Sequence, residues 1–364
     1  MSTDALGGGR PATGRVGAQR RRFAPRGLQA PIAIVFLLTL VLFVVELVVS
    51  DGSASTTFSA IVVLATITAV VAFGQGIAVL TGGFDLSIPW TVTTAAVLTA
   101  AWSDGTNASA AWAIPAVLGV GIAIGAINGL GIVFLRLPPI IMTLAANVWL
   151  QGAVLLYTDG TPTGSAPPFL ASLMNGQWLG GWVPYCLPFL LVFTFLGVFL
   201  LRRTVFGRYV YAFGNSGVAS RLSGVPVKRT VVGVYAAAGF CSALTGMLLV
   251  GFSGQSALGI GESYLLPSLA AVVIGGASVM GGRGSYIGTL GGALLLTTLA
   301  ALLATLNIND ATREIVFGLT ILVSALLVGS SSETRTRLSA MFEGWNGTRG
   351  ISAGRLSKRK EVRE

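Results

Sequence analysis

Residues 202–229 read RRTVFGRYVYAFGNSGVASRLSGVPVKR and form a polar stretch between two long apolar runs. The stretch carries six Arg or Lys residues and no Asp or Glu. Short basic loops of membrane proteins are retained on the cytoplasmic side, so this stretch fixes the orientation of a chain that crosses a membrane. It is also the longest polar connection on its side. We therefore expect a cytoplasmic partner to dock here.

The composition of the 364 residues is that of an integral membrane protein. The chain is 53% hydrophobic and only 10% charged, whereas soluble domains are about 25% charged. It contains no His, the commonest metal ligand and general base, so no metal site is predicted and the chain is not expected to be an enzyme. Cys186 and Cys241 fall in predicted spans and are interpreted as packing residues. The basic residues concentrate in the tails and a few loops, which favours anionic lipid over nucleic acid as the reason for the net charge of +10.

Apolar runs predict an all-α protein with ten membrane spans. The runs cover residues 30–49, 58–80, 89–102, 111–135, 138–157, 183–201, 230–252, 264–280, 285–306 and 314–329. The third and eighth runs are short for a bilayer that needs about twenty residues, which indicates broken or re-entrant helices. The predicted organisation is a basic, disordered cytoplasmic tail over residues 1–29, a ten-helix domain over 30–329 and a second basic cytoplasmic tail over 330–364.

The positions of the basic residues test this count of spans. Alternate crossing from a cytoplasmic N-terminus leaves only Arg313, of 23 Lys and Arg, on the exterior side. This asymmetry favours an even number of spans and two cytoplasmic termini. The longest exterior connection, residues 158–182, is either an ordinary loop or a structured lip that docks an external partner.

Two series of glycines predict close packing between helices. They are Gly121, Gly125 and Gly129 in the fourth run, and Gly284, Gly288 and Gly292 around the start of the ninth. A glycine at every fourth position gives a helix a face of bare backbone, which a neighbouring helix approaches closely. Neither series follows a strand, and the chain has no G-x-x-x-x-G-K-[ST] motif, so no nucleotide site of that kind is predicted.

The sequence TGGFDLSIPW, residues 81–90, places an acidic residue where two apolar runs meet. A carboxylate at the bilayer centre costs about 2.5–3.5 kcal/mol, so Asp85 needs a reason to be there. Asp85 and Ser87 are candidate residues of a substrate pathway or hinge. Alternatively, Asp85 caps the third helix while Gly82 and Gly83 end the second. The two roles are compatible.

A polar stripe runs along the predicted helix of residues 138–157. Thr143, Asn147 and Gln151 share one face of it at positions i, i+4 and i+8. They either bond to neighbouring helices or line a wet path for a hydroxylated solute, and both interpretations stay open. The other acidic residue inside a span, Glu46, lies near its exterior end and is expected to snorkel to the interface.

Four segments, in order along the chain, resemble the permease subunits of ribose- and xylose-type ATP-binding-cassette sugar importers. They are GGFDLSIP at 82–89, PPIIMTLAANVWLQGAVLLYTDGTP at 138–162, FGRYVYAFGNSGVASRLSGVPVKR at 206–229 and AAVVIGGASVMGGRGSYIGTLGGALLL at 270–296. The resemblance is collinear from about residue 58 to residue 329, and only the tails fall outside it.

The resemblance implies the ten-helix importer fold, similar to that of the cobalamin importer permease, with the path along an interface between permeases. The implied partners are a second permease subunit, expected as a homodimer, two cytoplasmic ATPase subunits and an extracytoplasmic sugar-binding protein. ATP and Mg would be bound by the ATPase, so this chain needs no cofactor. A coupling helix over residues 215–224 would seat in the ATPase, with matching positions at Asn215, Ala219, Arg221, Leu222 and Gly224. The expected cargo is a small neutral sugar: a pentose, hexose or polyol.

Two departures from the family pattern change these expectations. Ser216, Gly217 and Val218 stand where the family has an acidic residue and Ala, so the start of the coupling helix would be weaker by a few tenths to about 1 kcal/mol. After DLS the family usually continues with Val and Gly, whereas this chain has Ile88, Pro89 and Trp90. Pro89 would stiffen that helix start, and Trp90 would narrow the path and so affect the size of sugar that passes.

Two alternative functions remain. Permeases for branched-chain amino acids or nucleosides share the fold and parts of these motifs. An ion-coupled secondary transporter would instead need Asp85 or Glu46 as a titratable group inside the membrane.

Overall fold

The computed structural model describes residues 26–50 and 52–329, and the remainder of the two predicted tails lies outside these ranges. The helices that coincide with the predicted spans are α1 (Arg26–Val49), α2 (Ala54–Leu80), α3 (Ile88–Ser103), α4 (Asn107–Phe134), α5 (Pro139–Thr158), α7 (Cys186–Arg203), α10 (Val227–Ser253), α11 (Leu265–Ile274), α12 (Tyr286–Thr305) and α13 (Asp310–Gly329). Each predicted span overlaps one of them, so the predicted all-α membrane fold is confirmed. Helix α1 begins at Arg26, inside the predicted tail.

Membrane-spanning length is reached by most of these helices. Among the described residues, seven are long and apolar enough to cross a membrane, namely α1, α2, α4, α5, α7, α10 and α12. The two runs predicted to be short have 16 residues in α3 and 10 in α11. At 1.5 Å per residue, α11 is about 15 Å long, half of a bilayer's hydrocarbon core. Both helices continue through irregular backbone, as a broken span requires.

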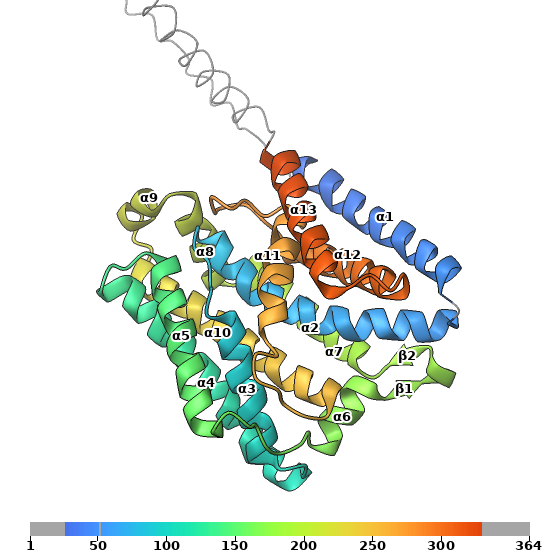
Figure 1. The fold of residues 1–364 in the computed structure, drawn as a ribbon. Helices are drawn as coiled ribbons and strands as arrows, with labels where there is room; N and C mark the ends of the chain where they lie inside the picture. The colour runs from blue at the N-terminus through green and yellow to red at the C-terminus, as the bar shows by residue number, and fades with distance from the viewer. Residues whose placement is uncertain (1–25, 51, 330–364) are drawn as a thin grey trace, which may run out of the picture.

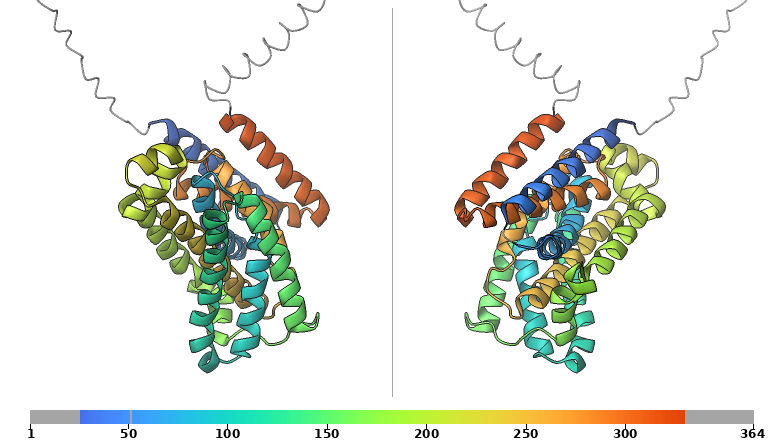
Figure 2. Two further views of the ribbon diagram at one scale, coloured as in Figure 1. Left: turned by 90° about the vertical axis from the view of Figure 1, so that its left-hand side faces the viewer. Right: turned by 90° about the vertical axis from the view of Figure 1, so that its right-hand side faces the viewer.

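Helix α2 forms the centre of the molecule. Figure 2 views it along its axis with the other helices around it. It packs against α10, α11, α12 and α7, and its residues are buried on every side from Ile61 to Leu80, except at Leu64. A helix that is apolar all round belongs in a core, because no face of it favours water. Two of its neighbours, α10 and α12, lie more than 140 residues away in sequence.

Glycines bring α4 and α10 into close contact. A Cβ on Gly121 would lie 2.6 Å from the carbonyl oxygen of Gly239, and one on Gly125 would lie 2.0 Å from that of Tyr235. A Cβ on Gly129 would lie 2.6 Å from the Cα of Val232. No side chain fits between backbones at these distances, so each position admits only glycine.

The second glycine series lies against α11. A Cβ on Gly288 would lie 2.0 Å from the carbonyl oxygen of Gly275, and one on Gly292 would lie 2.2 Å from that of Ala271. Gly284 is placed differently, since it precedes α12 with φ 159° and faces Ala277. Small residues thus let the half-length α11 lie close along α12.

The connection at residues 158–182 is structured. It contains α6 (Pro168–Asn175), the strand β1 (Gln177–Trp178) and the short helix η1 (Leu179–Gly181), and β1 pairs with β2 (Val183–Pro184) in an antiparallel hairpin. Ser59 Oγ donates to the carbonyl oxygen of Gly181 at 2.8 Å, which ties the hairpin to α2. We call this side of the molecule the hairpin end.

Two further helices lie at the opposite end from the hairpin. They are α8 (Val205–Asn215) and α9 (Gly217–Leu222), within the basic stretch that precedes α10 (Figure 1). The start of α1 and the end of α13 lie at the same end (Figure 2). We call it the α9 end. The described chain therefore starts and finishes at the same end of the molecule.

Glu46 does not snorkel to the interface, so that prediction was wrong. Its side chain is 4% exposed, and its Oε1 accepts a hydrogen bond from Thr305 Oγ1 at 2.8 Å. The packing of α1 against α12 covers this carboxylate. A hydroxyl on the facing helix therefore bonds one oxygen of this carboxylate, while Oε2 is buried without a partner among the described residues.

Candidate functional site

The break between α2 and α3 is held by hydrogen bonds around Asp85. Its Oδ1 accepts from the backbone N–H of Ser87 at 2.9 Å and from Ser87 Oγ at 2.5 Å. Asp85 is 1% exposed and Ser87 is equally buried. The carboxylate therefore fixes the turn immediately before α3, where Ser87 occupies the N-cap position without a side-chain cap bond.

The end of α2 follows the glycine pattern of the sequence. Gly82 has φ 77°, a left-handed conformation that glycine adopts without strain. Its N–H donates to the carbonyl of Val79 at 2.9 Å, and the N–H of Gly83 donates to that of Ala78 at 3.1 Å. These two bonds are the Schellman ending of a helix. The prediction that Gly82 and Gly83 end the helix is confirmed.

Helix α5 supplies polar atoms to the same junction. Thr143 Oγ1 accepts from the backbone N–H of Leu86 at 3.0 Å, and Asn147 Oδ1 accepts from that of Trp90 at 3.3 Å. Thr143 is fully buried, whereas Asn147 and Gln151 are half-buried one and two turns further along α5. The structure thus brings four of the five predicted pathway residues together and gives their side chains a structural task at the start of α3.

Two amides that the sequence did not single out complete this polar junction. Gln75 Oε1 accepts from the backbone N–H of Asp85 at 3.3 Å, and Asn128 Nδ2 donates to Ser87 Oγ at 2.9 Å. Both side chains are fully buried, and within the part of the chain that the structure describes Gln75 Nε2 and Asn128 Oδ1 have no partner. A lone polar residue inside an apolar run was the available signal for each, since buried amides in a membrane helix need partners.

Within the segment predicted to be a coupling helix, residues 215–224, the structure forms the shorter helix α9, Gly217–Leu222. Ser216 Oγ accepts from the N–H of Ala219 at 3.2 Å and so caps its start. Gly224, with φ 77°, ends it: its N–H donates to the carbonyl of Arg221 at 3.1 Å. Asn215 precedes the helix and is the last residue of α8. Hydrogen bonds at both ends therefore hold a helix of only six residues.

The connection from α11 to α12, residues 275–285, fastens α8 to the core. Tyr211 Oη donates to the carbonyl of Gly284 at 2.9 Å. Burial raises the pKa of the Tyr211 hydroxyl, which keeps it a donor, and Arg202 opposes this shift. The N–H of Gly282 donates to the carbonyl of Leu80 at 2.9 Å. The connection between α11 and α12 is thus hydrogen-bonded both to α8 and to the end of α2.

Charge is divided between the two ends of the described structure. The exposed basic residues at the α9 end are Arg136, Arg202, Arg203, Arg208, Arg221, Lys228, Arg229 and Arg283. The exposed acidic residues lie toward the hairpin end and are Asp104, Asp159, Glu262 and Glu314. The orientation stays a prediction: under the positive-inside rule, the basic end would face the cytoplasm.

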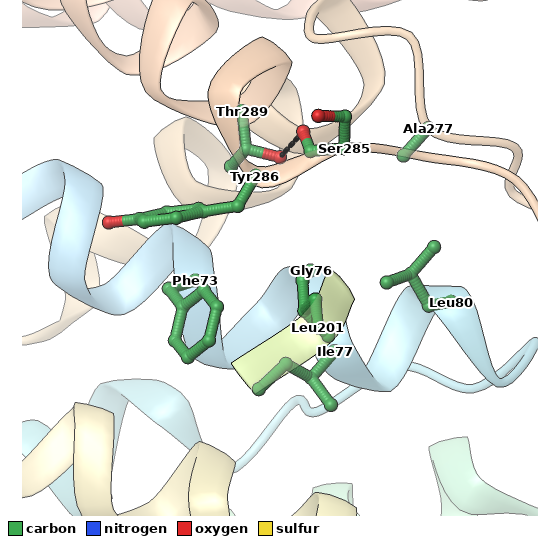
Figure 3. Close-up of a pocket in the computed structure, with 9 residues that line it drawn as sticks. All are labelled: Phe73, Gly76, Ile77, Leu80, Leu201, Ala277, Ser285, Tyr286 and Thr289. Carbon is green, nitrogen blue, oxygen red and sulfur yellow. Dashed lines mark hydrogen bonds between the residues drawn. The ribbon is translucent and has the colours of Figure 1, made fainter. Parts of the chain in front are cut away.

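A narrow cavity between α2, α7 and α12 is too small to hold a sugar. Figure 3 shows Phe73 and Tyr286 closing it on one side. Its free volume is about 10 Å³, which is at the limit for a single water molecule. A second cavity, of about 170 Å³, lies at the hairpin end between α2 and α6 and is lined by residues such as Ser59 and Asn175. None of the predicted pathway residues lines either cavity.

Comparisons with known proteins agree with this architecture. A family model described as branched-chain amino acid transport system / permease component matches residues 57–325. The ribose import permease protein RbsC of Escherichia coli K12 is 32% identical over 312 residues, which cover 85% of this chain and 96% of that protein. RbsC of Bacillus subtilis is 36% identical over 72% of this chain and 81% of its own length.

A third relative is named for the import of a different sugar. The fructose import permease protein FrcC of Rhizobium meliloti is 30% identical over 81% of this chain and 83% of its own length. No solved structure matches the chain. The matched region contains the α2–α3 junction, α9 and the connection between α11 and α12. The chain therefore belongs to the family of permease components of the branched-chain amino acid transport system type.

Proposed function

We propose that this chain is the membrane subunit of an importer that carries a small neutral sugar toward the cytoplasm. An extracytoplasmic binding protein delivers the sugar, a second copy of the chain completes the path, and a separate cassette ATPase binds ATP and Mg and drives transport. Sugar permeases among the relatives support the cargo class. The single observation that supports the coupling is α9, a short exposed helix held at both ends on a basic face.

Transport would begin with a movement of α9. Closure of the ATPase dimer pushes α9, and the two permease copies rock between outward-open and inward-open states. Energy enters because the ATPase binds these states with different affinity, which is what any population shift requires. The hydrogen bonds from α8 to the connection at residues 275–285, and from that connection to the end of α2, support a rigid transfer of that motion.

The position of α5 supports a path between two copies. Only Thr143, Leu150 and Val154 of this helix are buried. Its exposed apolar residues include Ile141, 57% exposed, and Val148, 60% exposed. A second subunit on this face would cover these residues. It would leave Asn147 and Gln151, the half-buried residues of the polar stripe, beside the transport path between the two subunits.

Reconstitution tests the proposal. The purified permease is mixed with candidate cassette ATPases and loaded binding proteins, and ATP hydrolysis is measured across pentoses, hexoses, polyols, branched-chain amino acids and nucleosides. Stimulation by one sugar-loaded binding protein is expected. Stimulation only by an amino acid or a nucleoside would show that this compound, and not a sugar, is the cargo. Collapse of uptake on removal of the membrane potential, with ATP present, would favour ion coupling.

The substitution Arg221→Glu isolates the coupling step. It reverses the charge of an exposed side chain on α9, so we expect loss of stimulated ATP hydrolysis with normal membrane insertion. Arg136→Glu is the control, because Arg136 is exposed at the same end on the α4–α5 connection. Unchanged hydrolysis in Arg221→Glu would contradict the assigned role of α9.

A further inference from the structure

The connection between α11 and α12 contains a turn whose tip is exposed and apolar. Its turn is closed by two backbone hydrogen bonds, from the N–H of Ser278 to the carbonyl of Arg283 at 2.8 Å and from the N–H of Gly281 to the carbonyl of Ser278 at 2.9 Å. The residues at the tip are Val279, 42% exposed, and Met280, 87% exposed. An unbranched thioether held out on a closed turn is an adaptable contact for another surface.

Hydrogen bonds place this turn beside α9. Asn215 Nδ2 donates to the carbonyl of Gly282 at 3.4 Å, and a Cβ on Gly282 would lie 2.9 Å from the backbone nitrogen of Asn215. Asn215 directly precedes Ser216, the N-cap of α9. In Figure 1 the connection between α11 and α12 extends toward α8 and α9. The turn and α9 therefore belong to one face.

Like the turn, helix α9 exposes apolar side chains and an arginine. Val218 is 70% exposed and Leu222 is 86% exposed. Arg221 lies between them in sequence, and Arg283 is the exposed basic residue of the turn. Exposed apolar side chains close to arginine are typical of protein–protein contacts, in which a few such residues carry most of the affinity.

We propose that the turn at residues 278–283 is a second contact for the ATPase, which would bind it together with α9. This inference rests on the function proposed above. The ATPase is the occupant because the turn continues the α9 surface through Asn215. Its surface would be acidic opposite Arg221 and Arg283, since the described α9 end exposes basic residues and no acidic ones.

A second contact gives the ATPase a route to the α2–α3 junction. The N–H of Gly282 donates to the carbonyl of Leu80, the last residue of α2. A Cβ on Gly214 would lie 1.9 Å from the same carbonyl oxygen, so α8 and α2 meet without a gap. A displacement of the turn would act on the end of α2 directly, and from there on the Asp85 turn.

The first test uses the full chain in nanodiscs and the cassette ATPase that the wild type binds. We expect Met280→Glu to weaken ATPase binding about tenfold, as loss of a central interface residue does. Leu179→Glu is the control, since Leu179 is 78% exposed at the hairpin end. Wild-type affinity in Met280→Glu, alongside weakened binding in Leu222→Glu, would overturn the second contact and leave the proposed function intact. A wild type that binds no cassette ATPase would overturn both.

The second test asks what covers the tip. The cysteines that the chain has, Cys186 and Cys241, are buried, so Met280→Cys introduces one reactive thiol. We expect a water-soluble maleimide to label it, and added ATPase to slow that labelling about tenfold, as a tightly buried contact would. Leu179→Cys should label equally with and without ATPase. Failure of Met280→Cys to label in ATPase-free nanodiscs would place the tip in lipid and overturn the inference.

Discussion

At the scale of single residues, glycine is the side chain whose role is easiest to test, and α4 offers a matched pair. Gly125→Ala places a methyl group 2.0 Å from the carbonyl oxygen of Tyr235. We expect a loss of about 1–3 kcal/mol of stability, the usual range for overpacking. The measurement is thermal unfolding of the purified permease.

The control for this substitution lies in the same helix. A Cβ on Gly119 meets nothing within 4 Å, so Gly119→Ala should leave stability unchanged or raise it by about 0.5–1 kcal/mol, through the higher helix propensity of Ala. Equal melting temperatures for the two variants would contradict the packing role of the Gly121, Gly125 and Gly129 series.

Some residue roles were readable in the sequence and others were not. The glycine spacing and Gly82 were readable, because they depend on local geometry. The partners of Gln75 and Asn128 were not, since Asp85 and Ser87 lie in the α2–α3 break, which folding brings to these two helices. Glu46 was assigned to the interface from its distance along α1, but its burial depends on where α12 packs.

At the scale of elements, α9 depends on its cap. Ser216 supplies the side-chain oxygen that accepts from Ala219 N–H. We expect Ser216→Ala to destabilise α9 by about 1 kcal/mol, and Ser216→Asp to keep the cap while adding a carboxylate at the helix start, which is favourable by about 0.3–1 kcal/mol. Hydrogen exchange of residues 216–223 measures the difference. Slower exchange in Ser216→Ala than in Ser216→Asp would contradict this account.

The elements were predicted well where apolar periodicity continued to a polar boundary. The run at residues 264–280 was an exception, because α11 ends at Ile274. Gly275 and Gly276 end it: the first lies against Gly288, and the second has φ 84°. The apolar residues beyond them, including Val279 and Met280, extended the run in the sequence although they belong to the exposed turn. Helix α8 was also missed as a separate element, since its basic and aromatic residues read as loop.

At the scale of the whole molecule, orientation follows from the division of charge. Single cysteines at Arg221 and at Asp104 would mark the two ends, both positions being exposed. We expect an impermeant maleimide applied to right-side-out vesicles to label Asp104→Cys and not Arg221→Cys, because basic loops are retained inside. Inside-out vesicles should give the reverse pattern. Labelling of Arg221→Cys from the outside would invert the topology and remove α9 from the reach of a cytoplasmic ATPase.

The central position of α2 also constrains how the chain is made. The helix leaves the ribosome early, yet Gly74 packs against Ala238 and Cys241 of α10, which are synthesised more than 160 residues later. Contacts of such separation form late, and until then α2 and its buried Gln75 have lipid or the insertion machinery as neighbours. The helix at the centre of the finished protein is therefore among the last to acquire its native neighbours, because those neighbours belong to the C-terminal half of the chain.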